Sequence, residues 1–282
     1  MAINNFIPEV WSARLLSSLK KSLVFAGPGV ANRDYEGDIR QSGDTVRITS
    51  ISRPTIGDYV KNSTTITPET LTDAQRSLLI SQSKYFAFEV DDIDMRQAAN
   101  GGALMNEAAS EAAYGLADVA DQYVAGLYTE VQAANAISTT AITDPAKAVK
   151  GLLDLKTKLD VADVPTQGRY VVVPPWYLNL LLQSDLFARV DASGTSEGLR
   201  NGTVGRAWGF DVMMSNNCVL ITGDDYAVMA GVPGAISFAE QIVKVEAYRP
   251  ESAFSDALKG LHLYGAKVVR PDALAVLTAS VT

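Results

Sequence analysis

The sequence predicts an α+β protein in which long strands, one long helix and an inserted α/β unit follow one another. Three observations carry this prediction. Two alternating segments flank a polar stretch between residues 43 and 90, an Ala-rich helical pattern runs from 103 to 131, and helical and β-branched segments alternate from 144 to 231. No internal repeat of fixed period is visible, so we do not expect a repeat architecture.

The bulk properties fit a soluble globular protein without a membrane span. The chain has 282 residues, of which 47% are hydrophobic and 20% charged, and no apolar run reaches the ~20 residues that span a bilayer. At roughly 150 residues per domain, this length suggests two domains or one large domain with insertions. The first residues do not resemble a secretory signal, and the single cysteine forms no disulfide within the chain, so an intracellular, reducing origin is expected.

The charge balance argues against a protein that mainly grips nucleic acid. The chain has 24 Lys and Arg against 32 Asp and Glu, a net charge of −8. Binding to phosphate backbones depends on clustered basic side chains. Sequence-specific recognition of nucleic acid is therefore not expected.

Residues 8–25 predict a short amphipathic helix carried on an arm. Pro8 lies near its start and Gly27-Pro28-Gly29 follows its end. Residues 32–38 are polar and show no periodicity, so the helix has no adjacent element to pack on. We therefore expect it to reach a neighbouring molecule. The apolar residues of the pattern are Val10, Leu15, Leu16, Leu19 and Leu23.

Residues 43–90 predict a projecting β-hairpin. Val46, Ile48 and Ile51 mark the outward strand, and Phe86, Phe88 and Val90 share one face of the expected return strand. The intervening residues 53–77 hold too few large apolar groups to form a core, namely Ile56, Tyr59, Val60, Ile66 and Leu71. An isolated two-stranded ribbon is marginal in water, so the missing apolar surface is expected on another molecule. This pattern indicates assembly rather than catalysis.

The next segment predicts one long helix over residues 103–131. At ~1.5 Å per residue it would measure about 40 Å. Its apolar stripe comprises Leu104, Ala108, Ala112, Leu116, Val119, Tyr123, Leu127 and Val131. The small residues along it, such as Ala109, Ala113 and Gly115, allow a sheet or a second helix to approach closely.

The α/β unit begins with a capped helix. Asp144 is the expected N-cap and Pro145 the first helical residue, followed by an apolar face. A β-branched strand is predicted at Arg169–Val173, a helix at 176–183, a Gly-rich loop at 193–209, and short strands at Phe210–Met214, 219–222 and 227–230. Further strands are predicted at 242–248, 261–269 and 273–277. These last strands are expected to return beside the long helix.

The residues that suggest chemistry also have simpler explanations. His262 lies in a strand-like run, and Cys218 has no second thiol to share a metal, so a core histidine and a small buried hydrophobe are favoured. Asp91, Asp92 and Asp94 would suit Mg²⁺ or Ca²⁺, but acidic residues before a long helix also complement its dipole. We favour the helix-capping role. Glycines at 194–209 match no phosphate-binding pattern.

The order of the segments resembles the major capsid (coat) proteins of tailed bacteriophages, an architecture shared with encapsulin shells and the herpesvirus capsid floor. The resemblance spans almost the whole chain, and the order of the pieces carries it more than any one of them. The similar pieces are FIPEVWS (6–12), DYEG (34–37), GDTV (43–46), RYVVVPP (169–175), GTVGRAWGF (202–210) and YGAKV (264–268).

The resemblance implies a division of the chain. It places an N-terminal arm and lead-in strand at 1–49, an extended hairpin loop at 50–90, a peripheral domain at 91–143 and 240–282, and an axial domain at 144–239. It implies contacts between subunits through the hairpin and the arm, and an axial loop rich in glycine. The hairpin residues are Ile56, Tyr59, Val60, Lys61, Ile66 and Leu71, the arm residues are Trp11, Leu15 and Leu19, and the loop residues are Gly198, Gly202 and Gly205.

The function implied is self-assembly into an icosahedral head shell around double-stranded DNA. Hexamers and pentamers of one chain would form the shell, with scaffolding, portal and decoration proteins as possible partners and no catalytic residue, cofactor, metal or membrane. The protein would be assembled in the host cytoplasm and reside in the virion. An acidic wall suits this container because it binds the polymer weakly. Two alternatives remain open, an encapsulin-type compartment and a metal-dependent hydrolase using Asp91, Asp92 and Asp94.

Overall fold

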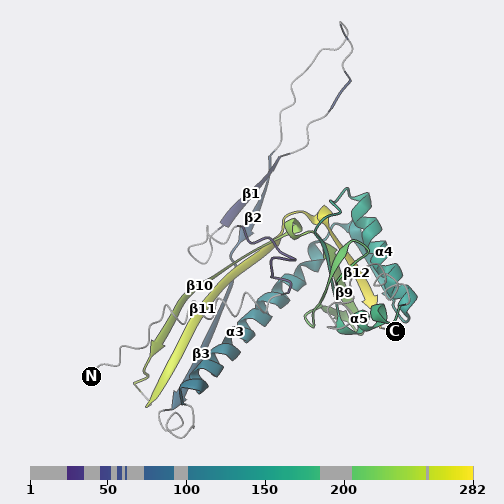
Figure 1. The fold of residues 1–282 in the computed structure, drawn as a ribbon. Helices are drawn as coiled ribbons and strands as arrows, with labels where there is room; N and C mark the ends of the chain where they lie inside the picture. Colours follow the sequence, from purple (N-terminus) through teal and green to yellow (C-terminus); the bar gives the residue numbers. More distant parts are fainter. Residues whose placement is uncertain are drawn as a thin grey trace.

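The structure, a computed structural model, describes residues 24–34, 45–51, 56–58, 61, 73–91, 101–184, 205–251 and 254–281. Within them the chain builds a three-stranded sheet flanked by the long helix, a seven-stranded sheet with two helices, and a two-stranded ribbon that projects from the body (Figure 1). The predicted α+β class is confirmed. The expected helix at 8–25, with Trp11, Leu15 and Leu19, lies outside the described residues apart from its end.

The projecting ribbon is formed by β1 (Thr45–Ile51) and β2 (Asp73–Leu79), which pair antiparallel with Thr45 opposite Leu79. The prediction that the return strand lies at residues 85–90 was wrong. Those residues belong to β3 (Gln82–Asp91), which pairs with β11 (Ser255–Val268) instead. The sequence DAQRSLL of β2 is too polar to show alternation, whereas the half-buried Phe86 and Phe88 of β3 alternate because a helix covers one face of that strand.

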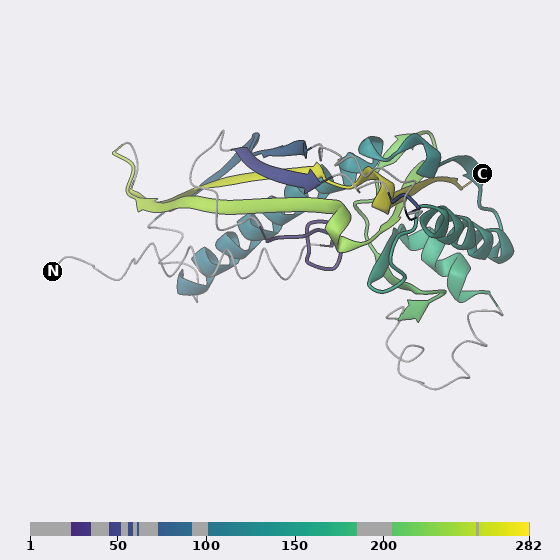
Figure 2. The same cartoon turned by 90° about the horizontal axis from the view of Figure 1, so that it is seen from above.

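The three-stranded sheet has the order β10–β11–β3 and is antiparallel throughout, with β10 spanning Ile236–Tyr248. The helix α3 (Gly101–Ala125) runs along one face, as Figures 1 and 2 both show, and a 3₁₀ turn, η2 (Gly126–Glu130), continues it. Ala109 and Ala113 of α3 pack against Val245 and Leu258 of the sheet.

The buried face of α3 is rotated relative to the predicted stripe. Val119, expected on the apolar face, is 38% exposed, and Ala108 and Ala112 are only half-buried. The side that packs is rich in alanine because a methyl group lets the helix backbone approach the sheet closely, whereas the larger side chains do not. The buried residues on this side are Ala109, Ala113, Leu116, Ala117, Ala120 and Val124.

The seven-stranded sheet has the order β4–β12–β9–β5–β7–β6, with β8 paired to β9. Its strand β5 (Arg169–Val173) is buried at every residue, which explains its continuous β-branched run. The other strands are β4 (Ala136–Ala141), β6 (Arg206–Ala207), β7 (Phe210–Met214), β8 (Leu220–Thr222), β9 (Asp225–Gly231) and β12 (Leu274–Ser280). Short 3₁₀ turns, η3 (Ala133–Asn135), η4 (Pro233–Ala235) and η5 (Pro271–Ala273), precede β4, β10 and β12.

Two helices pack with this sheet. In α4 (Pro145–Val161), the Asp144 carboxylate accepts a hydrogen bond from the backbone N–H of Lys147 at 2.8 Å, which confirms the predicted N-cap. The predicted apolar face of α4 is buried. In α5 (Pro175–Leu182), the Tyr177 hydroxyl donates to the carbonyl of Ala148 at 2.7 Å and ties the two helices together.

The last strand lies in a different place from the one predicted. The sequence led us to expect residues 273–277 beside the long helix, but β12 sits between β4 and β9 in the seven-stranded sheet. All seven residues of β12 but one are buried, as a central strand requires. Residues 136–141 and 274–280 thus share one sheet with residues 169–231.

The largest buried cluster among the described residues extends across both the three-stranded and the seven-stranded sheet. It contains the inner residues of the seven-stranded sheet, the apolar faces of α4 and α5, the C-terminal half of α3, and four residues of the segment 24–34, namely Phe25, Ala26, Val30 and Ala31. No helix within the described residues is both long and apolar enough to cross a membrane.

Candidate assembly surfaces

The hairpin presents an apolar side chain to solvent. Ile56 is 91% exposed, more than any other large apolar residue in the described part of the chain, and Gly57, Asp58 and Lys61 beside it are exposed too. Of the six hairpin residues predicted to make contacts, Ile56 and Lys61 are described, and Tyr59, Val60, Ile66 and Leu71 lie outside the described residues. The hairpin therefore lacks cover for the apolar group that the structure shows there.

A second apolar surface lies on the face of the three-stranded sheet that points away from α3, called here the outer face. Tyr85 of β3 is 79% exposed, and its cross-strand neighbour on β11, Leu261, is 37% exposed. These residues point away from α3 because side chains alternate along a strand and Phe86 packs toward the helix. Exposed apolar side chains that are neighbours in this way are typical of an interaction surface.

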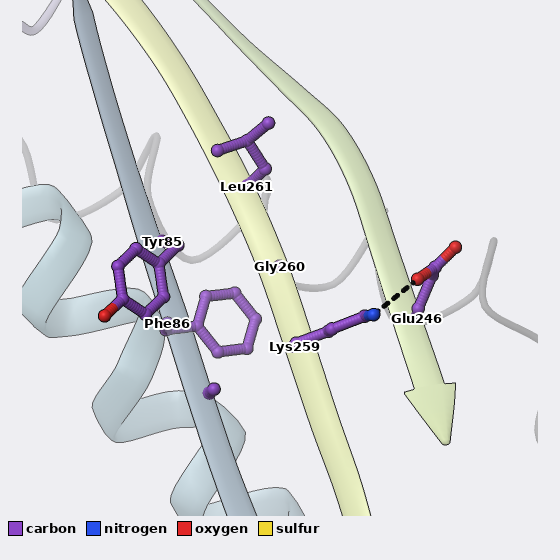
Figure 3. Close-up of a pocket in the computed structure, with 7 residues that line it drawn as sticks. Tyr85, Phe86, Glu246, Lys259, Gly260 and Leu261 are labelled. Atoms are coloured by element: carbon purple, nitrogen blue, oxygen red, sulfur yellow. Dashed lines mark ion pairs between the residues drawn. The ribbon is translucent and has the colours of Figure 1, made fainter.

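Charged residues border this surface. On the outer face, Lys259 forms an ion pair with Glu246 at 3.1 Å (Figure 3). Its ammonium group also lies 5.0 Å from the centre of the Tyr248 ring. Both charged side chains are partly exposed, so the pair contributes little to stability. An apolar centre with a polar rim is the usual composition of a protein interface.

A groove of about 400 Å³ opens between β3 and β11 beside this surface. Figure 3 shows the Phe86 ring lying between the two strands next to Gly260. A Cβ atom at Gly260 would collide with the ring of Phe86, so only glycine leaves room for the ring there. The groove residues are Tyr85, Phe86, Ala87, Glu246, Lys259, Gly260 and Leu261.

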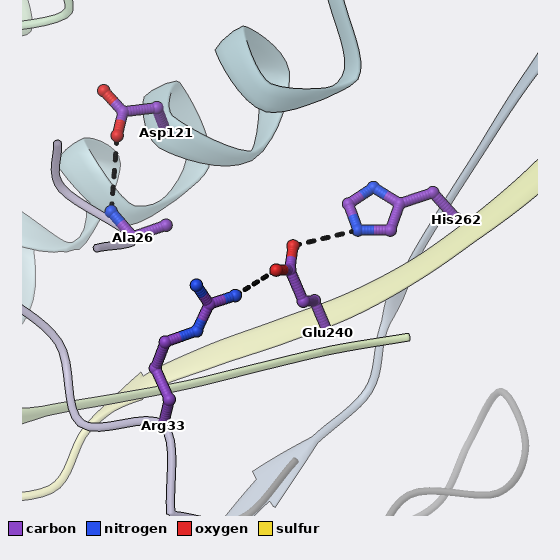
Figure 4. Close-up of polar contacts among 5 residues, drawn as sticks. All are labelled: Ala26, Arg33, Asp121, Glu240 and His262. Atoms are coloured by element: carbon purple, nitrogen blue, oxygen red, sulfur yellow. Dashed lines mark hydrogen bonds and ion pairs between the residues drawn. The ribbon is translucent and has the colours of Figure 1, made fainter. Parts of the chain in front are cut away.

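The segment 24–34, which follows the predicted arm helix, is fixed to the body by hydrogen bonds. Oδ1 of Asp121 on α3 accepts from the backbone N–H groups of Val24 (2.9 Å), Phe25 (2.6 Å) and Ala26 (3.3 Å), as Figure 4 shows for Ala26. Further along, the N–H of Asn32 donates to the carbonyl of Ile236 at 2.8 Å. The arm thus leaves the body from an ordered attachment.

Three ionisable side chains meet where this segment crosses the sheet. Arg33 is hydrogen-bonded to Glu240 of β10, and Nε2 of His262 on β11 lies 3.2 Å from the other carboxylate oxygen (Figure 4). Burial alone would raise the pKa of Glu240, but the hydrogen bond from His262 and the charge of Arg33 together hold the pKa of this carboxyl below its ordinary value. This cluster could not be predicted from the sequence, because Arg33 and Glu240 are far apart in the chain and lie in no recognisable motif.

His262 and Cys218, the two residues considered as catalytic candidates, are both buried inside the protein. His262 is fully buried in the cluster just described, and Cys218 is buried, where burial and the nearby Asp121 raise the pKa of its thiol to about 12. A thiol of that pKa is a poor nucleophile at neutral pH.

The proposed metal ligands are not brought together within the described chain. Asp91 is exposed at the end of β3, and Asp92 and Asp94 lie outside the described residues. Among the residues that the structure describes, no three His, Cys, Asp or Glu side chains are grouped to hold a metal ion. Of the loop glycines, Gly205 is described and exposed, and Gly198 and Gly202 are not described.

Comparison with known proteins identifies the class. The family model described as phage capsid protein matches residues 75–277, and the chain belongs to this family. A solved structure from Mycobacterium phage Che8 is 34% identical, with a TM-score of 0.74, over 98% of each chain. A comparison with curated proteins gives no match.

More distant structures share the fold. The capsid of the cyanophage P-SCSP1u has a TM-score of 0.68 at 16% identity, over 86% of this chain and 85% of that one. A virus-like particle from Pyrococcus furiosus has a TM-score of 0.57 at 14% identity, over 96% and 98%.

The predicted resemblance to tailed-phage major capsid proteins is confirmed, and with it the predicted function as a major capsid protein. The protein is a structural component of the virion rather than an enzyme, and many copies of it form a shell.

Proposed function

We propose that the hairpin of each copy lies on the outer face of a neighbouring copy, and that this contact closes the chains into an icosahedral shell of hexamers and pentamers around double-stranded DNA. The observation that carries the proposal is that two exposed apolar sites lie on different parts of one subunit. The ribbon of β1 and β2 projects from the body (Figure 1), and the exposed Ile56 lies in the segment between these two strands. Tyr85 and Leu261 lie on the outer face of the three-stranded sheet.

A contact between different surfaces of two copies is heterologous, and such contacts form rings when the rotation between copies closes. A ring of six or five copies then has every hairpin covered by the next copy. Burial of apolar surface contributes about 25 cal/mol per Å², so a contact made through a few apolar side chains is weak alone. Closure makes the later contacts intramolecular, so their combined effect is large.

The sheets support an assignment of domains within the shell. We assign the three-stranded sheet and α3 to a peripheral domain, and the seven-stranded sheet with α4 and α5 to an axial domain around the five-fold and quasi-six-fold axes. This assignment moves residues 136–141 and 274–280 into the axial domain, because their strands β4 and β12 are part of its sheet. The axial loop with Gly198, Gly202 and Gly205 would lie at these axes. Trp11, Leu15 and Leu19 would contact a neighbour through the arm.

The net charge of −8 supports DNA as contents that the wall holds without specific contacts. Scaffolding, portal and decoration proteins complete the proposed set of partners, and the host cytoplasm is the proposed place of assembly.

Deletion of residues 53–77 tests the role of the hairpin. The segment contributes nothing to the main core among the described residues, so the variant should keep the circular dichroism and thermal unfolding of the wild type. Electron microscopy should show closed particles for the wild-type chain and only subunits for the deletion. Shells of normal size from the deletion would contradict the proposal.

An encapsulin-type compartment is the alternative to a DNA-filled head. Particles isolated from their natural source and treated with nuclease distinguish the two. Protected double-stranded DNA supports the head, whereas a protein cargo without DNA supports the compartment.

A further inference from the structure

We propose that Gly265 of β11 is a positioning residue that fixes the direction in which the hairpin leaves the body, and thereby the geometry of assembly. The inference rests on the proposed role of the hairpin in contacting a neighbour. It concerns the junction where the hairpin joins the three-stranded sheet.

The chain changes its pairing partner at this junction. β2 pairs with β1 and ends at Leu79, and β3 starts at Gln82 and pairs with β11, where Gln82 lies opposite Tyr264. Only Ile80 and Ser81 separate the two strands. The angle between the ribbon and the three-stranded sheet therefore depends on what contacts this short junction.

Gly265 contacts the junction through backbone atoms. A Cβ atom at Gly265 would lie 2.5 Å from the carbonyl oxygen of Leu79 and 3.0 Å from Cα of Ile80. Backbone atoms cannot turn aside as a side chain can, so an added methyl group has to move the junction itself. Ala239, the cross-strand neighbour of Gly265 on β10, is also small, so the two residues together form a shallow seat for the crossing chain.

A small separate cluster holds the junction on this seat. Leu78 and Ile80 are buried against Ala239 and Leu263, and this cluster is distinct from the main core. Leu263 and Gly265 lie two residues apart on β11 and face the same side of the sheet. The hairpin is thus oriented by a local contact whose loss leaves the packing of the main core in place.

Gly265→Ala should turn the hairpin without unfolding the body. Spin labels at Ile56→Cys on the hairpin and Val161→Cys on α4 report the direction, since both positions are exposed and Cys218 is buried. Pulsed electron paramagnetic resonance on dissociated subunits should give a shifted mean distance between the two labels in Gly265→Ala. Electron microscopy of the unlabelled variant should show at least tenfold fewer closed particles, because a loss of roughly 1.4 kcal/mol lowers the association constant of each contact tenfold and the losses multiply over the shell.

Two glycines provide matched controls. Gly260→Ala, on the same strand, collides with the Phe86 side chain and not with the junction, so it should lower stability and keep the distance. Gly234→Ala places its methyl group in open space and should change neither. If Gly265→Ala does not fold, Leu263→Ala decides the question: removing its side chain from under the hairpin should broaden the distance distribution, whereas a loss of stability with an unchanged distribution would overturn the inference.

Wild-type distances and wild-type particle yields in both Gly265→Ala and Leu263→Ala would overturn the inference. Its failure is distinguishable from failure of the proposed function. If the deletion of residues 53–77 assembles normally, the role of the hairpin is wrong, whereas a blocked deletion together with unaltered point variants refutes only the positioning by Gly265.

Discussion

Glu240 is the centre of the buried charge cluster with Arg33 and His262. It lies between Arg33 and His262, and its side chain is 1% exposed. Removing one partner from a buried charge pair leaves the other uncompensated in a medium of low dielectric constant, which is costly. The cluster therefore contributes to stability only while all of its members are present.

Glu240→Gln should lower the free energy of unfolding by about 3 kcal/mol, because Arg33 then loses the buried carboxylate with which it pairs. Urea denaturation measures the change. Glu246→Gln, the same substitution on the same strand, breaks the partly exposed pair with Lys259 and should cost less than about 1 kcal/mol. Equal effects of the two substitutions would show that the buried position gives Glu240 no special role.

The contribution of Glu240 should depend on pH in one direction. Folding lowers the pKa of this carboxyl below its ordinary value of 4.5. A carboxyl with a lowered folded pKa stabilises the protein fully above its unfolded pKa, and this stabilisation is lost as the pH falls through the folded pKa. The difference in unfolding free energy between wild type and Glu240→Gln should therefore shrink as the pH is lowered below 4.5. A difference that grows with acidity would contradict the assignment.

Asp121→Ala should release the segment 24–34. The buried carboxylate accepts from three successive backbone N–H groups, so its loss leaves these donors unpaired and should cost about 3 kcal/mol. Hydrogen exchange followed by mass spectrometry should show faster exchange at Phe25 and Ala26. Asp118→Ala is the control, because the Asp118 carboxylate accepts only from Gln122 and Asn217 side chains among the described contacts. Unchanged protection in Asp121→Ala would contradict this role.

At the scale of elements, α3 depends on close contact with the sheet. Ala113 is buried against it, so Ala113→Leu overpacks the contact and should destabilise the protein by about 1–3 kcal/mol. Gly115 is exposed in the helix interior, and a Cβ there meets nothing within 4 Å. Gly115→Ala should therefore stabilise the protein by about 0.5–1 kcal/mol. Thermal unfolding measures both shifts, and shifts of the same sign would refute the assigned orientation of α3.

Elements with strong local signals could be predicted from the sequence. The cap of α4 and the β-branched run of β5 depend on neighbouring residues, and Phe210–Met214 was predicted with the bounds that β7 has. The strands β2 and β4 were missed because their polar sequences show no alternation, and only their partners define them. The rotation of α3 was missed because alanine packs closely while it contributes little to a pattern of apolar side chains.

The assembly surfaces, too, could be predicted only where neighbouring residues in the sequence define them. The polar hairpin that cannot form a core was evident from the sequence. The seat under its base was not, since Leu79 and Gly265 approach one another only after two separate sheets have formed. The cluster of Arg33, Glu240 and His262 was likewise missed, because no local pattern relates residues from three distant segments.

At the scale of the whole molecule, two defective variants should complement each other. Tyr85→Asp combined with Leu261→Asp places two charges on the apolar outer face and leaves the hairpin intact. Deletion of residues 53–77 removes the hairpin and leaves the outer face intact. Neither should assemble alone. Mixed, they retain one good contact and should form a one-to-one complex that cannot grow, which sedimentation at high concentration would detect. Tyr85→Phe, which keeps the ring, is the control and should assemble as the wild type does. Absence of a mixed complex would contradict a contact between hairpin and outer face.

The position of β12 has a consequence for synthesis on the ribosome. Ala136 of β4 pairs with Val276 of β12, and β12 also pairs with β9, so the seven-stranded sheet has a gap until residues 274–280 have left the exit tunnel. A nascent chain that still lacks them has an incomplete seven-stranded sheet. The strands β4 and β9 therefore stay apart during translation until their common partner arrives, by which time β10 and β11 have already been made.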